Sequence, residues 1–137
     1  MNKSQKLAKL FKAGAVGVAL ACAATALAAT GGELAMLGTL TKGAWVLRIR
    51  DDGSQQRICV RDGQEFIQLR HKQPGCSRFV SQDQPDMVAV QYTCRGNGYG
   101  RTTIRREADG LVQIQSQGIV DGAPFSISGE ARHAGDC

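Results

Sequence analysis

The sequence of 137 residues has little of what metal sites and hydrolase active sites are built from. It contains two histidines, and no two cysteines are separated by only two residues, the spacing that structural zinc sites commonly use. It also has no G-x-S-x-G segment, the turn that carries the nucleophile of α/β-hydrolases. We therefore expect no bound metal and no other cofactor, and a catalytic role is the less favoured interpretation.

Charge is missing from a long stretch near the start, since no charged residue lies between Lys12 and Glu33. Four lysines precede this Ala-, Val- and Leu-rich stretch, and Ala26-Leu27-Ala28 offers the small-x-small pattern that signal peptidase accepts. We interpret residues 1–28 as a signal peptide for bacterial export, which predicts a periplasmic or secreted protein. A membrane anchor would need about 20 predominantly apolar residues, and glycine and threonine dilute this stretch. A lipoprotein would carry its leucine one place further from Cys22.

Removing the leader removes most of the positive charge. Four of the 17 basic residues belong to the leader and none of the 12 acidic ones, so 13 basic residues remain against 12 acidic ones. A nucleic-acid-binding domain needs a strongly basic surface. We therefore expect no nucleic-acid partner, no stable membrane span in the mature chain, and one small domain.

Apolar and polar residues alternate along most of the mature chain. Trp45, Leu47 and Ile49 point to one side of an extended segment, which is the period of a half-buried strand. Further alternating runs follow, separated by turns of the Asp-Gly type, which connect antiparallel strands. These turns are Asp52-Gly53, Asp109-Gly110 and Asp121-Gly122.

The pattern predicts a mainly β fold: an antiparallel meander of about seven strands, in a curled sheet or partial barrel, with one short helix. The helix is expected within residues 62–72, where the alternation breaks. Residues 29–41 are expected to form a flexible N-terminal arm, and residues 42–137 the β domain. Ile104 is almost the only apolar residue of its segment, so the core is thin and a supplement to burial is needed.

Four cysteines remain after the leader is removed, and an even number in a small exported chain indicates two disulfides. Three pairings are possible in principle. If the loop of residues 82–86 closes a hairpin, Cys76 lies almost opposite Cys94, which leaves Cys59 for Cys137. That pairing would tie the final residue to the second strand and close most of the domain into a covalent loop.

A cluster of arginines surrounds one predicted hairpin and is the best candidate ligand site. An anionic partner, such as a lipid head group or a polysaccharide, could be held there, because Arg101 and Arg105 share a face of the strand. The alternative is a solvated strand whose arginines pair with Glu107 and Asp109. The candidate residues are Arg95, Tyr99, Arg101, Arg105 and Arg106.

Three other features have simpler explanations than catalysis or ligand binding. The glycines of residues 96–100 do not have the dinucleotide-binding spacing and predict a tight hairpin. Ser128, His133 and Asp136 could be combined into a hydrolase triad, but nothing in the local sequence supports it. We expect His71 to be a surface residue.

Several short motifs together resemble an exported bacterial family catalogued as domain of unknown function number thirty-six seventeen. The resemblance extends from about Leu37 to Cys137 and implies a periplasmic or otherwise exported setting, with no established reaction. The motifs are Gly43-Ala44-Trp45, Cys59, Cys76, Tyr92-Thr93-Cys94, Glu130-Ala131-Arg132 and Gly135-Asp136-Cys137.

The leader, the paired cysteines and the missing catalytic motifs together favour a non-catalytic binding or accessory module of the cell envelope. Its expected partner is an anionic envelope component. The alternative is a small secreted hydrolase or an enzyme inhibitor.

Overall fold

The computed structural model describes residues 34–137. The predicted signal peptide and Cys22 lie outside the described residues, and that prediction is not tested. Within residues 34–137, no helix is long and apolar enough to cross a membrane.

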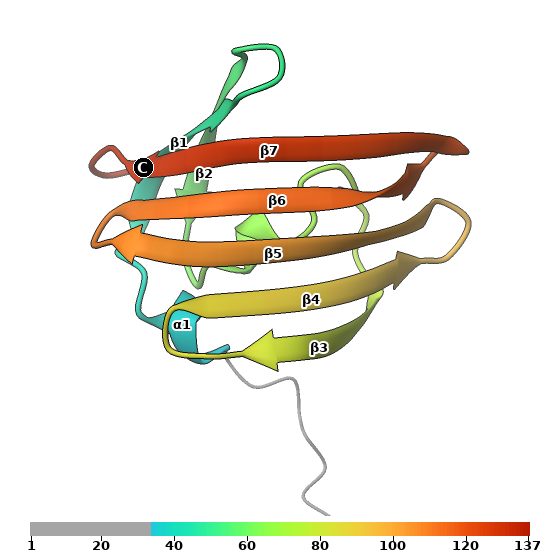
Figure 1. The fold of residues 1–137 in the computed structure, drawn as a ribbon, viewed down its shortest axis with the longest axis horizontal. Helices are drawn as coiled ribbons and strands as arrows, with labels where there is room; N and C mark the ends of the chain where they lie inside the picture. Colours follow the sequence, from blue (N-terminus) through green and yellow to red (C-terminus); the bar gives the residue numbers. More distant parts are fainter. Residues whose placement is uncertain (1–33) are drawn as a thin grey trace, which may run out of the picture. The chain divides into compact units, whose positions relative to one another are not determined.

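Seven antiparallel strands form one sheet that does not close into a barrel, in the order β2-β1-β7-β6-β5-β4-β3 (Figure 1). The predicted fold class is confirmed. The strands are β1 (Gly43–Ile49), β2 (Gln55–Val60), β3 (Ser77–Asp83), β4 (Met87–Cys94), β5 (Gly98–Ala108), β6 (Leu111–Val120) and β7 (Ala123–His133).

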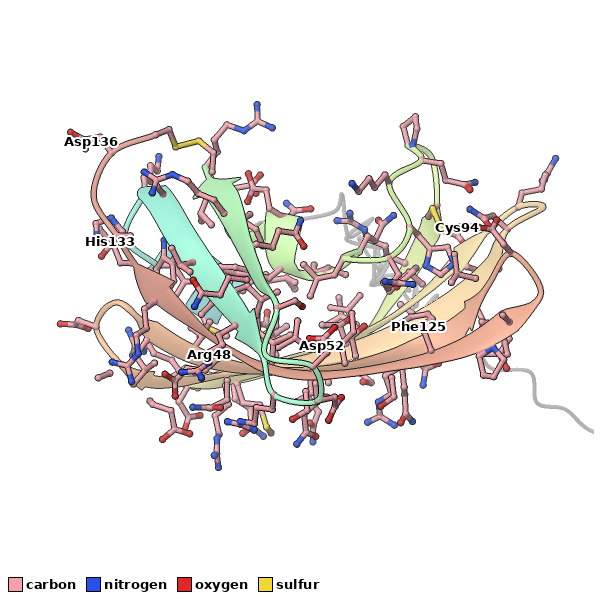
Figure 2. The ribbon with its side chains drawn as sticks, turned by 90° about the horizontal axis from the view of Figure 1, so that it is seen from above. Arg48, Asp52, Cys94, Phe125, His133 and Asp136 are labelled. Carbon is pink, nitrogen blue, oxygen red and sulfur yellow. A yellow bond between two sulfur atoms is a disulfide. The ribbon has the colours of Figure 1, made fainter. Side chains whose placement is uncertain are left out.

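Two short helices accompany the sheet. The predicted helix within residues 62–72 is a single 3-10 turn, η1 (Gln64–Phe66), which follows Gly63 in a left-handed conformation with φ of 80°. Residues 61–76, which we call the crossing segment, lead from β2 at one edge of the sheet to β3 at the other. Figure 2 shows the sheet bent into an open trough with this segment inside it.

The N-terminal segment differs from the flexible arm that we expected. The structure describes its residues from Leu34 onwards, and these include the helical turn α1 (Ala35–Gly38). Met36 and Leu37 are 0% and 1% exposed, because they pack into the core beside the sheet. The two apolar side chains supplement a sheet that has few of its own.

The core lies on the concave face of the sheet, to which every second residue of each strand directs its side chain. Trp45 is fully buried, and its indole N–H donates to the carbonyl of Thr41 at 2.8 Å. The ring of Phe66, from the crossing segment, meets the Trp45 ring edge-on at 5.6 Å. The strands add Leu47, Val60, Val88, Val90, Ile104, Val112, Ile114 and Ala131.

Both predicted disulfides are confirmed. Cys59 is joined to Cys137 with 5.6 Å between Cα atoms, and Cys76 to Cys94 with 4.4 Å. Cys59 precedes the crossing segment and Cys76 is its last residue. The two bonds therefore hold both ends of the segment that covers the core.

Removing either bond should destabilise the fold, and the bond that closes the longer loop should contribute more. The loops span 78 and 18 positions, so chain entropy alone gives about 4.5 kcal/mol for Cys59–Cys137 and about 3 kcal/mol for Cys76–Cys94. We expect the Cys59→Ser, Cys137→Ser variant to lose more free energy of unfolding in urea than the Cys76→Ala, Cys94→Ala variant.

The alanines in the second pair keep the buried Cys94 position apolar, so the comparison is not biased by a buried hydroxyl. An equal loss in both variants, or the reverse order, would show that lost packing rather than chain entropy governs these bonds.

Candidate functional site

The convex face of the sheet carries polar side chains in rows across the strands. The register places one such row side by side on five strands, and its members are Phe79, Gln91, Arg101, Gln117 and Ser126. With about 4.8 Å between strands, the row is about 19 Å long. It can therefore contact an extended ligand rather than only a single small ion.

Arg101 occupies the middle of this row and lies between two hollows. One hollow, of about 450 Å³, is also lined by Thr93 and Tyr99; the other, of about 440 Å³, is also lined by Thr103 and Ser128. Gln117 lines both hollows with Arg101. A guanidinium in this position can reach a ligand on either side.

Two facing glycines, Gly100 on β5 and Gly118 on β6, are among the residues that line the first hollow. A Cβ atom at Gly100 would collide with the Tyr92 ring, and one at Gly118 with the backbone carbonyl of Tyr99. Larger residues would therefore displace their neighbours, so the close packing of these strands requires glycine at both positions.

Two other arginines of the convex face are paired with carboxylates, whereas Arg101 is not. Arg105 forms an ion pair with Glu107 at 2.6 Å, and Arg132 forms one with Glu130 at 2.6 Å. Hydrogen bonds from Gln113 and Arg132 hold the pKa of Glu130 below its usual value. Among residues 34–137, the Arg101 guanidinium has no ion-pair or hydrogen-bond partner, so its donors are available to a ligand.

The structure divides the predicted arginine cluster. Tyr99, Arg101 and Arg105 share the convex face, as alternate residues of β5 must. Arg106 follows Arg105 directly and so faces the other way, where its guanidinium donates to the Thr39 hydroxyl at 3.2 Å. Arg95 lies in the turn between β4 and β5. Anion binding by these residues remains a prediction.

Sequence reasoning missed the two glutamines that flank Arg101. Gln91 on β4 and Gln117 on β6 lie opposite Arg101 only through the strand register. No spacing in the sequence signals that neighbourhood, although the polar positions of alternating strands mark all three residues as outward-facing.

The hypothetical hydrolase triad is not assembled. Ser128 and His133 lie five positions apart on β7, on opposite faces, about 17 Å apart along the strand. The Ser128 hydroxyl accepts a hydrogen bond from Arg50, and the His133 ring contacts the carbonyl of Lys42 at 3.2 Å. Asp136 follows the end of β7 (Figure 2). The glycines of residues 96–100 form the predicted hairpin between β4 and β5.

His71 is not the surface residue that we predicted, since it is 1% exposed. Its Nε2 lies 2.9 Å from the carbonyl of Asn97 and 3.0 Å from that of Ile119, so Nε2 carries the proton and donates. Its Nδ1 then accepts from the Tyr92 hydroxyl at 3.1 Å. These partners come from distant strands and turns, which explains why the burial of His71 could not be predicted from local sequence patterns.

Thr102 makes a second buried polar contact between the sheet and the crossing segment. The Thr102 hydroxyl donates to the carbonyl of Ile67 at 2.6 Å and lies 2.7 Å from the Ser116 hydroxyl. His71 and Ile67 both belong to the crossing segment, whereas their partners belong to the sheet or its turns. The polar groups of the core therefore attach the crossing segment and act structurally.

Among the described residues, no group of three or more histidines, cysteines, aspartates or glutamates is arranged to hold a metal ion. Comparison of the chain with protein-family models, with curated proteins and with solved structures gives no match. The resemblance to the exported bacterial family thus stays a prediction, and the geometry alone must carry the functional argument.

The Tyr92 hydroxyl should make stability depend on alkaline pH. Burial raises the pKa of Tyr92 above 10.0, and a hydrogen bond with Ser116 opposes this only in part. Folding therefore favours the protonated hydroxyl. Its contribution to the free energy of unfolding is complete below about pH 10 and is lost as the pH rises through the raised pKa. At pH 7, Tyr92→Phe should lose about 1 kcal/mol through the missing bond to His71.

The measurement is the free energy of unfolding of wild type and Tyr92→Phe between pH 7 and pH 11. The difference between the two proteins should shrink above pH 10, because only the wild type has the buried hydroxyl to ionise. A difference that stays constant over this range would contradict the assignment.

Proposed function

We propose that this chain is an exported, non-catalytic binding module of the cell envelope, which holds an anionic ligand on its convex face around Arg101. One observation carries the proposal. The Arg101 guanidinium has no partner among residues 34–137 and lies between two hollows, whereas Arg105 and Arg132 are paired with carboxylates.

The chemistry around Arg101 suits a carboxylate or phosphate group on a larger molecule. A guanidinium binds such anions through two parallel N–H donors. The amides of Gln91 and Gln117, on the adjacent strands, supply further donors and acceptors. The rings of Tyr99 and Phe79 are 56% and 66% exposed and offer apolar surface for the rest of the ligand.

The exported setting is supported by the two disulfides, since such bonds persist in oxidising compartments outside the cytoplasm. Residues 1–28 have the composition of a signal peptide, and this is why we propose the periplasm or secretion. A hydrolase is less well supported, because Ser128 and His133 lie on opposite faces of one strand.

Replacement of Arg101 tests the site. We expect Arg101→Ala to weaken binding about tenfold, which corresponds to one charged hydrogen-bonding group. The probes are polygalacturonate, which carries carboxylates, and vesicles of phosphatidylglycerol in phosphatidylcholine, which carry phosphates. Binding is measured by calorimetry or sedimentation and should weaken as salt is raised.

Arg105→Ala is the matched control, because it removes the same charge from the same face of the same strand. It should change affinity less than Arg101→Ala, since Arg105 is already paired with Glu107. The two probes distinguish a polysaccharide from a lipid head group. Unchanged binding of both probes by Arg101→Ala would remove this site, and a lack of binding by the wild type would count against the function itself.

A further inference from the structure

Half of β7 has a free edge. β1 pairs with β7 only from Gly129 to His133, and one more bond follows, from the Arg50 N–H to the Ser128 carbonyl at 2.8 Å. Within residues 34–137, residues 123–128 pair with β6 on one side and with no strand on the other. In Figure 1 this half of β7 continues beyond β1 and β2 along the margin of the sheet.

The free edge presents backbone groups in a regular pattern. Arg50 and Arg48 lie opposite Ser128 and Glu130, so the even-numbered residues of β7 direct their N–H and C=O groups to the β1 side. By the same alternation, Ser126 directs both groups to the open side. Pro124 offers a carbonyl only, because proline has no N–H. An extended polypeptide backbone is the natural complement of such an edge.

A cavity of about 710 Å³ lies beside this edge, between β7, the β1–β2 turn and the crossing segment. Its apolar lining includes Ile49, Leu69, Phe125 and Ile127, and Asp52 lines it from the turn. Asp52 and Phe125 are labelled in Figure 2. Side chains at alternate positions of an added strand would point the same way as Phe125 and Ile127 and enter the cavity.

The rim of the cavity carries charges of opposite sign on its two sides. Arg70 and Lys72 line it from the crossing segment and form no ion pair within residues 34–137. Asp51 and Asp52 line the turn side, and the Asp52 carboxylate already accepts from the Ser54 N–H at 2.9 Å and the Ser54 hydroxyl at 2.7 Å. The charges of the lining balance, and the two cations lie together on the side of the crossing segment, where an acidic residue of a partner would meet them.

We propose that the edge at residues 124–128 and the adjoining cavity bind an extended peptide segment of a partner protein, with a bulky apolar side chain in the cavity and an acidic residue close to it. The peptide continues the sheet in line with β1 and bonds through alternate amides, as in other cases of strand addition. The acidic residue faces Arg70 and Lys72. Ser126 also belongs to the row around Arg101, but the peptide would use its backbone groups at the strand edge, and the proposal does not depend on the function proposed above.

The edge of β3 is a weaker candidate for the same role. Its ladder is interrupted by a β-bulge between Val80 and Gln82, and bulges discourage further strand pairing. The largest cavity near β3, of about 920 Å³, is lined mostly by charged and amide side chains rather than by apolar ones. Pairing at β7 has both the backbone groups and the apolar surface.

The test uses the mature chain and a library of acetylated pentapeptides in which threonine alternates with leucine, isoleucine or phenylalanine and one position is glutamate. A selected peptide should shift the backbone amide signals of Ser126 and Ser128 in nitrogen-15 NMR spectra. N-methylation of its amides one at a time should weaken binding about tenfold at alternate positions only. That alternation distinguishes strand pairing from simple hydrophobic adhesion.

Protein variants give the second arm. Ser126→Pro removes the N–H on the open edge, so peptide binding should be lost. The bonds between β7 and β6 are kept, because the odd-numbered neighbours of Ser126 make them. Ser126→Ala keeps the N–H and should bind the peptide normally. Arg101→Ala should also bind the peptide normally. If Ser126→Pro does not fold, the N-methyl series on the wild type still decides. A library without a binder, N-methylation without alternation, or shifts confined to β3 would overturn the proposal.

Discussion

The attachment of the crossing segment to the concave face is the interaction on which the rest of this structure depends. An unclosed sheet would leave Trp45 and its neighbours in water, and residues 61–76 cover them. Phe66 supplies apolar contact, while His71 and the Ile67 carbonyl make the buried hydrogen bonds. Because buried polar groups are costly when unpaired, these bonds specify where the segment lies as well as holding it there.

Because the crossing segment covers the concave face, the side chains of the convex face are not needed to form the core. These side chains can be polar, and some pair with one another, as Arg132 and Glu130 do. Arg101 has no ion-pair or hydrogen-bond partner among residues 34–137, and it lies between two hollows of this face. Half of the β7 edge is free because β1 turns into β2 after Ile49 and no other strand of residues 34–137 takes its place.

The sequence was a good guide wherever structure is local. Alternation predicted the strands, Asp-Gly pairs predicted turns, and the hairpin geometry predicted the bond between Cys76 and Cys94. It failed where contacts join distant segments: the burial of His71 depends on Asn97 and Ile119, and α1 is helical in a segment that we expected to be flexible. The outward-facing residues of the candidate site could be predicted from the alternation of polar and apolar residues. Their neighbours on adjacent strands could not, because these depend on the strand register.

The position of β1 between β2 and β7 has a consequence for the order of assembly. The strands from β3 to β7 are consecutive neighbours, so each pair closes only a short loop, whose entropy is small. The contact of β1 with β7 instead joins opposite ends of the domain. The entropic barrier of folding is therefore concentrated in one docking event, and until it occurs the hairpin that carries Trp45 is an unprotected, aggregation-prone ribbon.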